Sequence, residues 1–240
     1  MKPIRGAQPN RSNPLARGLF NCWLFNEGGG DQVFDVAEGG LGSFGPGASW
    51  TVGPKGSVIN LGPDDGYVIL VNGAAPRHHA PSGFSFAIRL LFHRLPSTAP
   101  GTPILLDCQK SGGIRFWYLR GQTWNDQFSV AYYSPSGSSF SAASGFVVTL
   151  YQWYSVVFVF DGANGHLYID GVKRSMSGPS TIDEGTASLV RVGHTGTNST
   201  PDAEIEYVMF WDRPLTEAEA SRVTMDPYFI FGGTSPITVA

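Results

Sequence analysis

The chain has 240 residues, including 31 glycines and 17 prolines, with 13% aromatic and only 15% charged residues and a net charge of −3. This composition is typical of many short strands joined by tight turns, and the length suits one all-β domain that needs no disulfides. No apolar run approaches the roughly 20 residues of a membrane span, and the first residues lack the hydrophobic region of a signal peptide. We therefore expect a soluble protein made in a cytoplasm, with no membrane or nucleic-acid partner.

The N-terminus has a charge pattern of its own. Residues 1–17 contain three prolines and four cations, Lys2, Arg5, Arg11 and Arg17, but no acid, whereas the other 223 residues hold 12 Lys or Arg against 19 Asp or Glu. Such a basic, apolar-poor arm should be extended and mobile by itself and add little to the stability of the domain. Either it is a disordered start without consequence, or it orders against a partner surface.

The two cysteines, Cys22 and Cys108, lie within apparent strands. Neither has a second Cys or a His nearby at metal-ligand spacing. We interpret both as small core residues rather than as a disulfide or metal pair.

Residues 153–171 give the clearest local prediction. Residues 155–160 are β-branched and aromatic without polar alternation, which predicts a central strand covered on both faces. Residues 161–165 tolerate positive φ and predict a turn, and residues 166–170 alternate as a strand with one buried face. A second Asp-Gly, at 170–171, turns the chain again.

A strand that is apolar on both sides needs a second layer over each face of its sheet. The residues expected to be buried are Val157 and Val159 on one face, and Val156, Phe158 and Phe160 on the other. A loop, the C-terminal helix or a neighbouring molecule must cover the outer face.

The C-terminal region combines a helix with an aromatic run. Thr216 followed by Glu219 has capping-box spacing and predicts a helix over residues 216–223. Tyr228, Phe229, Ile230 and Phe231 then form four consecutive large apolar residues. They either pack back across the domain or are buried against a neighbouring subunit.

The hairpin at 153–171 resembles the corresponding hairpin of laminin-G-like domains in the concanavalin A-like lectin/glucanase superfamily. Matching blocks follow the family's order, at residues 18–35, 58–68, 84–89 and 205–216. The resemblance implies an all-β, antiparallel jelly-roll β-sandwich with one short C-terminal helix. The implied division is an arm at 1–17, a sandwich at 18–225 and a tail at 226–240.

The superfamily contains glycoside hydrolases, whose catalytic residues are paired carboxylates, so we consider the carboxylates of this chain as catalytic candidates. Asp202, Glu204 and Glu206 alternate along one segment, which places their side chains on one face. Their order, DxExE, departs from the ExDxxE pattern of sandwich glucanases, and no histidine belongs to a catalytic motif. We assign no catalytic residue and expect no enzyme activity.

Two kinds of ligand stay open. The resemblance allows calcium at the edge of the sandwich, with loop carboxylates as ligands. The carboxylates concerned are Asp64, Asp65, Asp161, Asp183 and Glu184. Their spacing does not indicate a metal site, and we expect no cofactor. Glycan contact needs aromatic platforms beside polar groups, and the candidates are Trp117, Trp124 and Tyr132.

Residues 10–28 resemble the start of stand-alone laminin-G-like proteins encoded among the structural genes of tailed bacteriophages. This resemblance implies a non-enzymatic virion protein on the capsid exterior, a decoration or cement protein that straps the major capsid protein and copies of itself as a homo-oligomer. The candidate partner-binding residues are Lys2, Arg5, Arg11, Arg17, Tyr228, Phe229 and Phe231. A carbohydrate-binding virion module and, next, a glycoside hydrolase are the alternatives.

Overall fold

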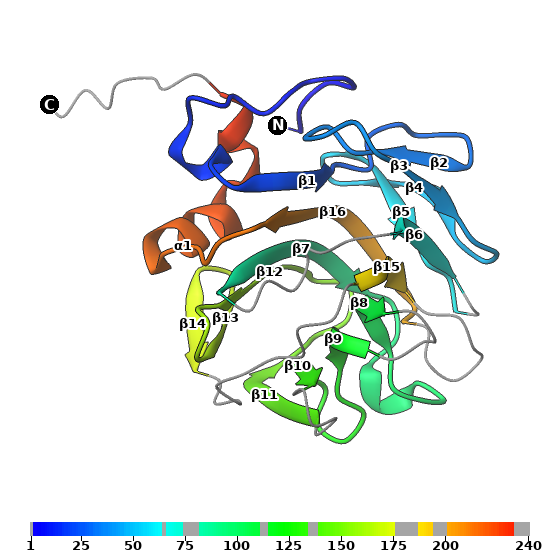
Figure 1. The fold of residues 1–240 in the computed structure, drawn as a ribbon. Helices are drawn as coiled ribbons and strands as arrows, with labels where there is room; N and C mark the ends of the chain where they lie inside the picture. Colours follow the sequence, from blue (N-terminus) through cyan, green and yellow to red (C-terminus); the bar gives the residue numbers. More distant parts are fainter. Residues whose placement is uncertain are drawn as a thin grey trace, which may run out of the picture.

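The computed structural model describes residues 2–63, 66–73, 82–110, 115–133, 139–175, 187–193 and 201–232. Its strands form two antiparallel sheets packed face to face (Figure 1), so the expected all-β sandwich is confirmed. Sheet A has the order β14 (Val172–Ser175), β13 (Gly165–Ile169), β12 (Trp153–Phe160), β7 (Phe84–Phe92), β16 (Ala203–Trp211), β5 (Gly56–Asn60) and β4 (Ser49–Gly53), and β1 (Leu19–Trp23) also pairs with β16. Sheet B has the order β11 (Ser139–Val147), β10 (Gln127–Tyr133), β9 (Arg115–Gly121), β8 (Ile104–Lys110), β15 (Ala187–Gly193), β6 (Tyr67–Asn72), β3 (Leu41–Phe44) and β2 (Gln32–Phe34).

The predicted meander is present as β12, β13 and β14. In register, Val156 faces Ile169 and Phe160 faces Gly165. The first turn is tight because the Asp161 carboxylate accepts hydrogen bonds from the amides of Ala163 and Asn164. Local turn chemistry therefore sets this hairpin as expected.

The main core lies between the two sheets and is largely aromatic. Alternate residues of β7, from Phe84 to Phe92, point into it. The Trp117 ring from sheet B stacks on Phe86, with ring centroids 4.6 Å apart. Both cysteines, Cys22 and Cys108, are buried and unpaired, which confirms their assignment as small core residues.

A second apolar layer covers the outer face of sheet A. Val157 and Val159 of β12 pack there with residues of the N-terminal arm and of α1 (Glu217–Met225), the one α-helix in the described part of the chain. All five predicted side chains of β12 are at most 2% exposed, so the two-sided burial of this strand is confirmed. The helix begins with the predicted capping box between Thr216 and Glu219.

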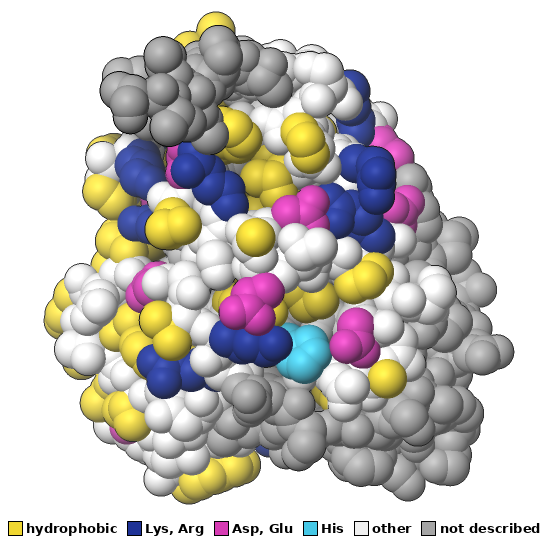
Figure 2. Space-filling view, turned by 90° about the vertical axis from the view of Figure 1, so that its left-hand side faces the viewer, with side chains coloured by type: hydrophobic (Ala, Val, Ile, Leu, Met, Phe, Trp, Pro, Cys, Tyr) yellow, Lys and Arg dark blue, Asp and Glu magenta, His cyan; other side chains and the backbone are white. Residues whose placement is uncertain are grey.

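The aromatic segment after α1 also packs back onto the domain. It forms a short 3-10 helix, Pro227–Phe231, in which Tyr228 and Ile230 are buried and Phe229 and Phe231 are partly buried against the outer layer. Of the two alternatives for this segment, packing back across the domain is therefore correct. On the face that carries α1 and β14, Figure 2 shows hydrophobic side chains scattered among charged ones of both signs.

Within the described residues no helix is long and apolar enough to cross a membrane.

Candidate functional site

The three predicted glycan-contacting aromatics occupy different environments. Trp117 and Tyr132 point into the core and are 1% and 2% exposed. Burial raises the pKa of the Tyr132 phenol to about 12, with the Asp161 carboxylate as the lesser cause. Neither ring can stack on a glycan, so this prediction is wrong for both. Trp124 is 67% exposed and stays a candidate.

Trp124 lies in the turn between β9 and β10, which is held firmly. The amide of Asp126 donates to the Gln122 carbonyl, and Asp126 has φ +51°. Its carboxylate accepts from the Ser97 amide (2.6 Å) and hydroxyl (2.8 Å). The exposed indole is therefore carried by a turn that is tied to the 3-10 helix Pro96–Thr98.

Backbone hydrogen bonds bring a third loop to the same end of the sandwich, which we call the rim: residues 93–98, 122–126 and 147–151. Val148 N donates to Asp126 O (2.7 Å), and Tyr151 N donates to Phe92 O (2.9 Å). Tyr151 is 68% exposed, with φ +59°, in a region that an aromatic residue rarely adopts. The rim thus holds two exposed aromatic side chains, Trp124 and Tyr151, on fixed loops.

Polar groups flank each of these aromatic rings. The Arg120 guanidinium lies 5.6 Å from the Trp124 ring and 5.4 Å from the Tyr118 ring on the outer face of sheet B. Beside Tyr151, the His93 ring packs edge to face at 5.6 Å, and His93 Nε2 lies 3.0 Å from Glu204 Oε1. Aromatic rings next to hydrogen-bonding groups suit ligands with both apolar and hydroxyl-bearing faces.

The outer face of sheet B continues this polar surface inward from the rim. Asp107 is buried and accepts from Arg191 (3.1 Å) and Gln109, while Arg115 Nε lies 3.4 Å from its other oxygen. In the strands of sheet B, Asp107 is the one Asp or Glu residue. Two guanidinium groups form ion pairs with this carboxylate, so it acts structurally as the centre of an ionic cluster.

The three acids of the DxExE segment have separate surroundings. Asp202 precedes β16. Glu206 lies on the outer side of sheet A, where a bulge between Ile205 and Tyr207 also places Tyr207. There Glu206 accepts from Arg89 Nε (2.9 Å) and from the Tyr228 hydroxyl. Burial and the Glu206 charge raise the pKa of Tyr228, which keeps this phenol a donor. Glu206 is therefore held inside a structural network.

The loop acids considered for calcium give no metal site in the described residues. Asp161 caps the β12–β13 turn, as noted above, while Asp64, Asp65, Asp183 and Glu184 lie outside the described residues. No group of three or more His, Cys, Asp or Glu side chains gathers at metal-binding distance in the described part.

The four arm cations divide into two pairs. Lys2 is 7% exposed, and its ammonium donates to the carbonyls of Phe25 and Ser57. Arg11 donates to Leu19 O (2.8 Å) and Ala37 O (2.6 Å). Arg5 and Arg17 are exposed. Lys2 and Arg11 thus serve their own domain, while Arg5 and Arg17 remain at the surface.

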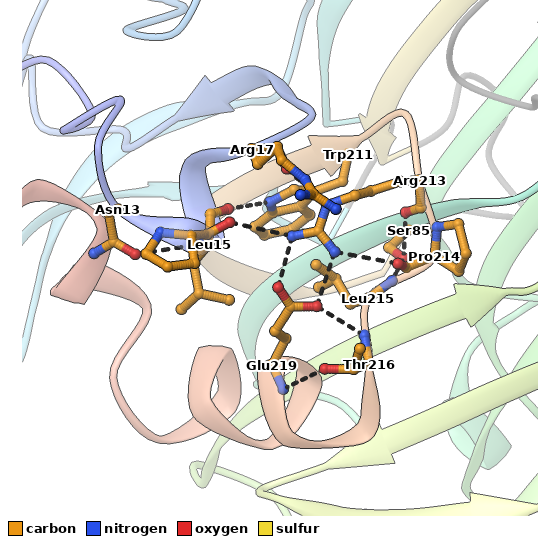
Figure 3. Close-up of polar contacts among 11 residues, drawn as sticks. Asn13, Leu15, Arg17, Ser85, Trp211, Arg213, Pro214, Leu215, Thr216 and Glu219 are labelled. Atoms are coloured by element: carbon orange, nitrogen blue, oxygen red, sulfur yellow. Dashed lines mark hydrogen bonds and ion pairs between the residues drawn. The ribbon is translucent and has the colours of Figure 1, made fainter.

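The end of the arm is clamped to the domain around Arg213 (Figure 3). Arg213 pairs with both oxygens of Glu219 (2.7 and 2.8 Å) and donates from Nε to Arg17 O (2.8 Å). The Trp211 indole donates to Leu15 O (2.7 Å), and Leu15 is 4% exposed. The expectation of a mobile arm is wrong, because the arm forms part of the layer over sheet A. From this packing we expect the arm to contribute to the stability of the domain.

Sequence reasoning missed the His93–Glu204 pair, the buried Lys2 and the Arg213 clamp. Each joins residues far apart in the chain; His93 and Glu204, for example, are 111 positions apart. The capping box was the one local sign near the clamp, since its Glu219 is also the partner of Arg213.

Comparison with known structures gives similar sandwiches in binding domains and in an enzyme. The binding domain of Paraclostridial Mosquitocidal Protein 1 has a TM-score of 0.71 at 13% identity, over 90% of this chain and 53% of that chain. Domain 4 of AbnA, a GH43 extracellular arabinanase from Geobacillus stearothermophilus solved with arabinotriose, has a TM-score of 0.64 at 13% identity, over 86% of this chain and 98% of that chain.

Trypanosoma rangeli sialidase in complex with sialic acid has a TM-score of 0.65 at 18% identity, over 89% of this chain. This chain spans only 33% of the sialidase. At such identities these similarities show the fold alone.

Curated protein sequences give no significant match. The Laminin_G_3 family model, described as concanavalin A-like lectin/glucanases superfamily, matches residues 65–221, which is more than half of the chain. On this match and on the two-sheet fold, the chain belongs to the concanavalin A-like lectin/glucanase superfamily.

Proposed function

We propose that this protein is a non-catalytic carbohydrate-binding module that holds glycans at the rim. The observation that carries the proposal is Trp124, a 67% exposed indole on a turn fixed by Asp126 and flanked by the Arg120 guanidinium. Tyr151, with His93 and Glu204 beside it, provides a second platform at the same end.

The chemistry of the rim suits a sugar chain. The C–H face of a pyranose or furanose ring packs on an indole or phenol ring, while its hydroxyls exchange hydrogen bonds with guanidinium, imidazole and carboxylate groups. A rigid turn lowers the ordering cost of binding, because Trp124 need not be immobilised by the ligand. The domain of the arabinanase solved with arabinotriose has this fold, which is consistent with the proposal.

A hydrolytic function has less support from the described residues. Glycoside hydrolysis generally requires two carboxyl groups about 5–10 Å apart across the scissile bond. The strands of sheet B contribute only Asp107, which two arginines engage, and Glu206 is enclosed by Arg89 and Tyr228. Binding without cleavage therefore fits these carboxylates better.

The test is binding to a panel of soluble polysaccharides, including arabinan, β-glucan and polygalacturonate, by affinity electrophoresis and tryptophan fluorescence. At least one polysaccharide should retard the wild type. Trp124→Ala should weaken that binding about tenfold, since the loss of about 1.4 kcal/mol of ring stacking corresponds to a factor of ten. Met225→Ala is the matched control, because Met225 is also 67% exposed but lies on α1.

Two results would contradict the proposal. The wild type could bind none of the polysaccharides, or Trp124→Ala could bind as tightly as the control variant. Release of reducing sugar by the wild type would instead favour a hydrolase.

Capsid decoration, expected from the resemblance to phage proteins, stays a second proposal. Ile4 is 82% exposed, and Arg5 and Arg17 are exposed, so part of the arm surface is accessible to a capsid subunit. Its test is the copy number on purified virions. Hundreds of copies would support decoration, a few to a few dozen would indicate a tail position, and none would contradict a virion role.

A further inference from the structure

The start of the N-terminal arm and the β2–β3 hairpin border a cleft of about 290 Å³, at the end of the sandwich away from α1 (Figure 1). We call it the arm cleft. One wall is the turn of the arm at Arg5, and the other is the exposed cross-strand pair of Phe34 and Leu41. Val33 and Val36 also line it and are buried. The arm cleft is therefore an open hollow with a largely apolar side on the hairpin.

Ile4 is an uncovered apolar side chain next to the arm cleft. It precedes Arg5 in the chain and is 82% exposed. The turn that carries it is fixed, because the Ala7 amide donates to Ile4 O (3.1 Å) and the Asn26 side chain donates to Pro3 O (3.0 Å). An apolar side chain on a fixed turn can be buried by a partner with little ordering cost. Ile4 thus projects from the surface beside a hollow.

The two sides of the arm cleft carry opposite charges. Arg5 is exposed and makes no ion pair with another described residue. Residues 31–41 contain three acids and no Lys or Arg. Asp35 is buried, whereas Asp31, before β2, and Glu38, after β2, are exposed. The projecting turn is therefore basic, and the hairpin that forms the hollow is acidic.

A projection and a hollow of opposite charge within one surface make that surface complementary to itself. A two-fold axis beside the turn brings Ile4 of each copy into the arm cleft of the other, with each Arg5 near the acids of the other copy. Apolar side chains that fill a pocket inside a polar border carry much of the binding energy of protein interfaces. Strand addition at β2 is disfavoured, because the outward Phe34 amide already donates to Glu27 Oε1 (2.8 Å). The contact is therefore made by side chains.

We propose that two copies of this chain form a two-fold dimer in which Ile4 of each copy enters the arm cleft of the other. The dimer surface consists of Ile4, Arg5, Asp31, Phe34, Glu38 and Leu41. It has fewer residues than the roughly 20–30 a side of a standard interface, so the dimer is weak, with a Kd of about 10–500 µM. The residues of the rim are not part of this surface, so dimer formation does not depend on glycan binding.

The test is sedimentation velocity of the full chain from about 1 to 500 µM, which spans the expected Kd. The mass should rise from the 25.8 kDa of the monomer towards twice that value. Ile4→Asp removes the projection and places a negative charge near the acids of the other copy, so this variant should stay monomeric. Leu41→Lys, on the opposite wall, faces Arg5 of the other copy and should act in the same way. Val52→Asp is the matched control, because Val52 is 85% exposed on β4, outside the dimer surface, and this variant should dimerise like the wild type.

An exchange of charges tests the two-fold arrangement itself. Arg5→Glu alone, and Asp31→Lys with Glu38→Lys in a second variant, should each weaken the dimer about tenfold or more, because like charges then meet across the axis. An equimolar mixture of the two variants should dimerise more tightly than either variant by itself. Both contacts of the mixed dimer again pair opposite charges.

Four results would overturn the proposal. The wild type could stay at the monomer mass over the whole concentration range, or the dimer could persist in both Ile4→Asp and Leu41→Lys. Val52→Asp could lose the dimer, which would place the contact elsewhere. A mass that grows past the dimer value would show an open chain of copies and contradict the two-fold arrangement, as would a mixture of the charge variants that dimerises no better than each variant alone.

Discussion

Replacement of Leu15 by Ala tests whether the N-terminal arm belongs to the folded domain. Leu15 lies in the layer over sheet A with Trp211 and Leu215, and its carbonyl accepts the Trp211 indole hydrogen bond. The alanine variant keeps this backbone hydrogen bond and removes only the apolar side chain. Its effect therefore measures the packing of the arm.

The size of the effect follows from the burial of Leu15, which is 4% exposed. Truncation of a buried leucine to alanine costs about 2–5 kcal/mol. The loss here cannot exceed the free energy with which the arm docks, so we expect the lower part of that range, about 2–3 kcal/mol. For a domain of this size, 1 kcal/mol lowers Tm by about 2–4 °C, which gives a fall of about 4–12 °C.

The assay is reversible urea unfolding, with calorimetry for Tm. Leu41→Ala is the matched control, because Leu41 is 62% exposed and should change stability by no more than about 0.5 kcal/mol. Deletion of residues 1–17 should lower Tm at least as far as Leu15→Ala, since Trp211 and Arg213 also lose partners. If the Leu15→Ala variant and the deletion variant both have the Tm of the wild type, the arm is detached in solution and the reasoning fails.

Three further expectations concern the core, the buried lysine and the rim. Phe158→Ala should cost about 3–5 kcal/mol in urea unfolding, because the ring packs between the sheets against Phe86, and a near-neutral effect would contradict its place in the core. Burial lowers the pKa of Lys2 from 10.5 to about 8, so between those values the unfolded chain binds more protons than the folded one and stability rises with pH. The wild type should gain about 2 kcal/mol relative to Lys2→Met between pH 7 and 9.5, and a difference that does not change with pH would rule out a depressed pKa. Asp126→Asn should leave one Ser97 donor weakly paired and speed amide hydrogen exchange at Ser97 and Val148, while unchanged exchange there would show that Asp126 does not hold the rim.

Features that depend on neighbouring residues could be predicted from the sequence. The β12–β13 hairpin follows from an apolar run, an Asp-Gly turn and an alternating strand, all within residues 153–171. The start of α1 follows from the Thr216 and Glu219 side chains, which satisfy backbone amides three residues away. The two-sided burial of β12 required a covering layer, although the sequence did not say what would form it.

The direction of the aromatic side chains on β9 and β10 depended on tertiary structure. Trp117 and Trp124 are seven positions apart, yet one lies in the core and the other on the rim. The difference arises because a register shift between Cys108 and Gln109 sets which side chains of β9 face inward, while Trp124 lies beyond the end of that strand. Strand alternation by itself gives the period but not the side of the sheet.

The fate of the arm also depended on tertiary structure. Its basic, proline-rich composition predicted mobility, but Lys2 finds carbonyl acceptors 23 and 55 residues away, and Leu15 and Trp211 meet across 196 residues. The sequence determined the charges and the apolar residues of the arm, and only the fold decided that they face their own domain. Hydrogen bonds and burial at such separations leave no periodicity in the chain, because they depend on surfaces that exist only once both sheets have formed.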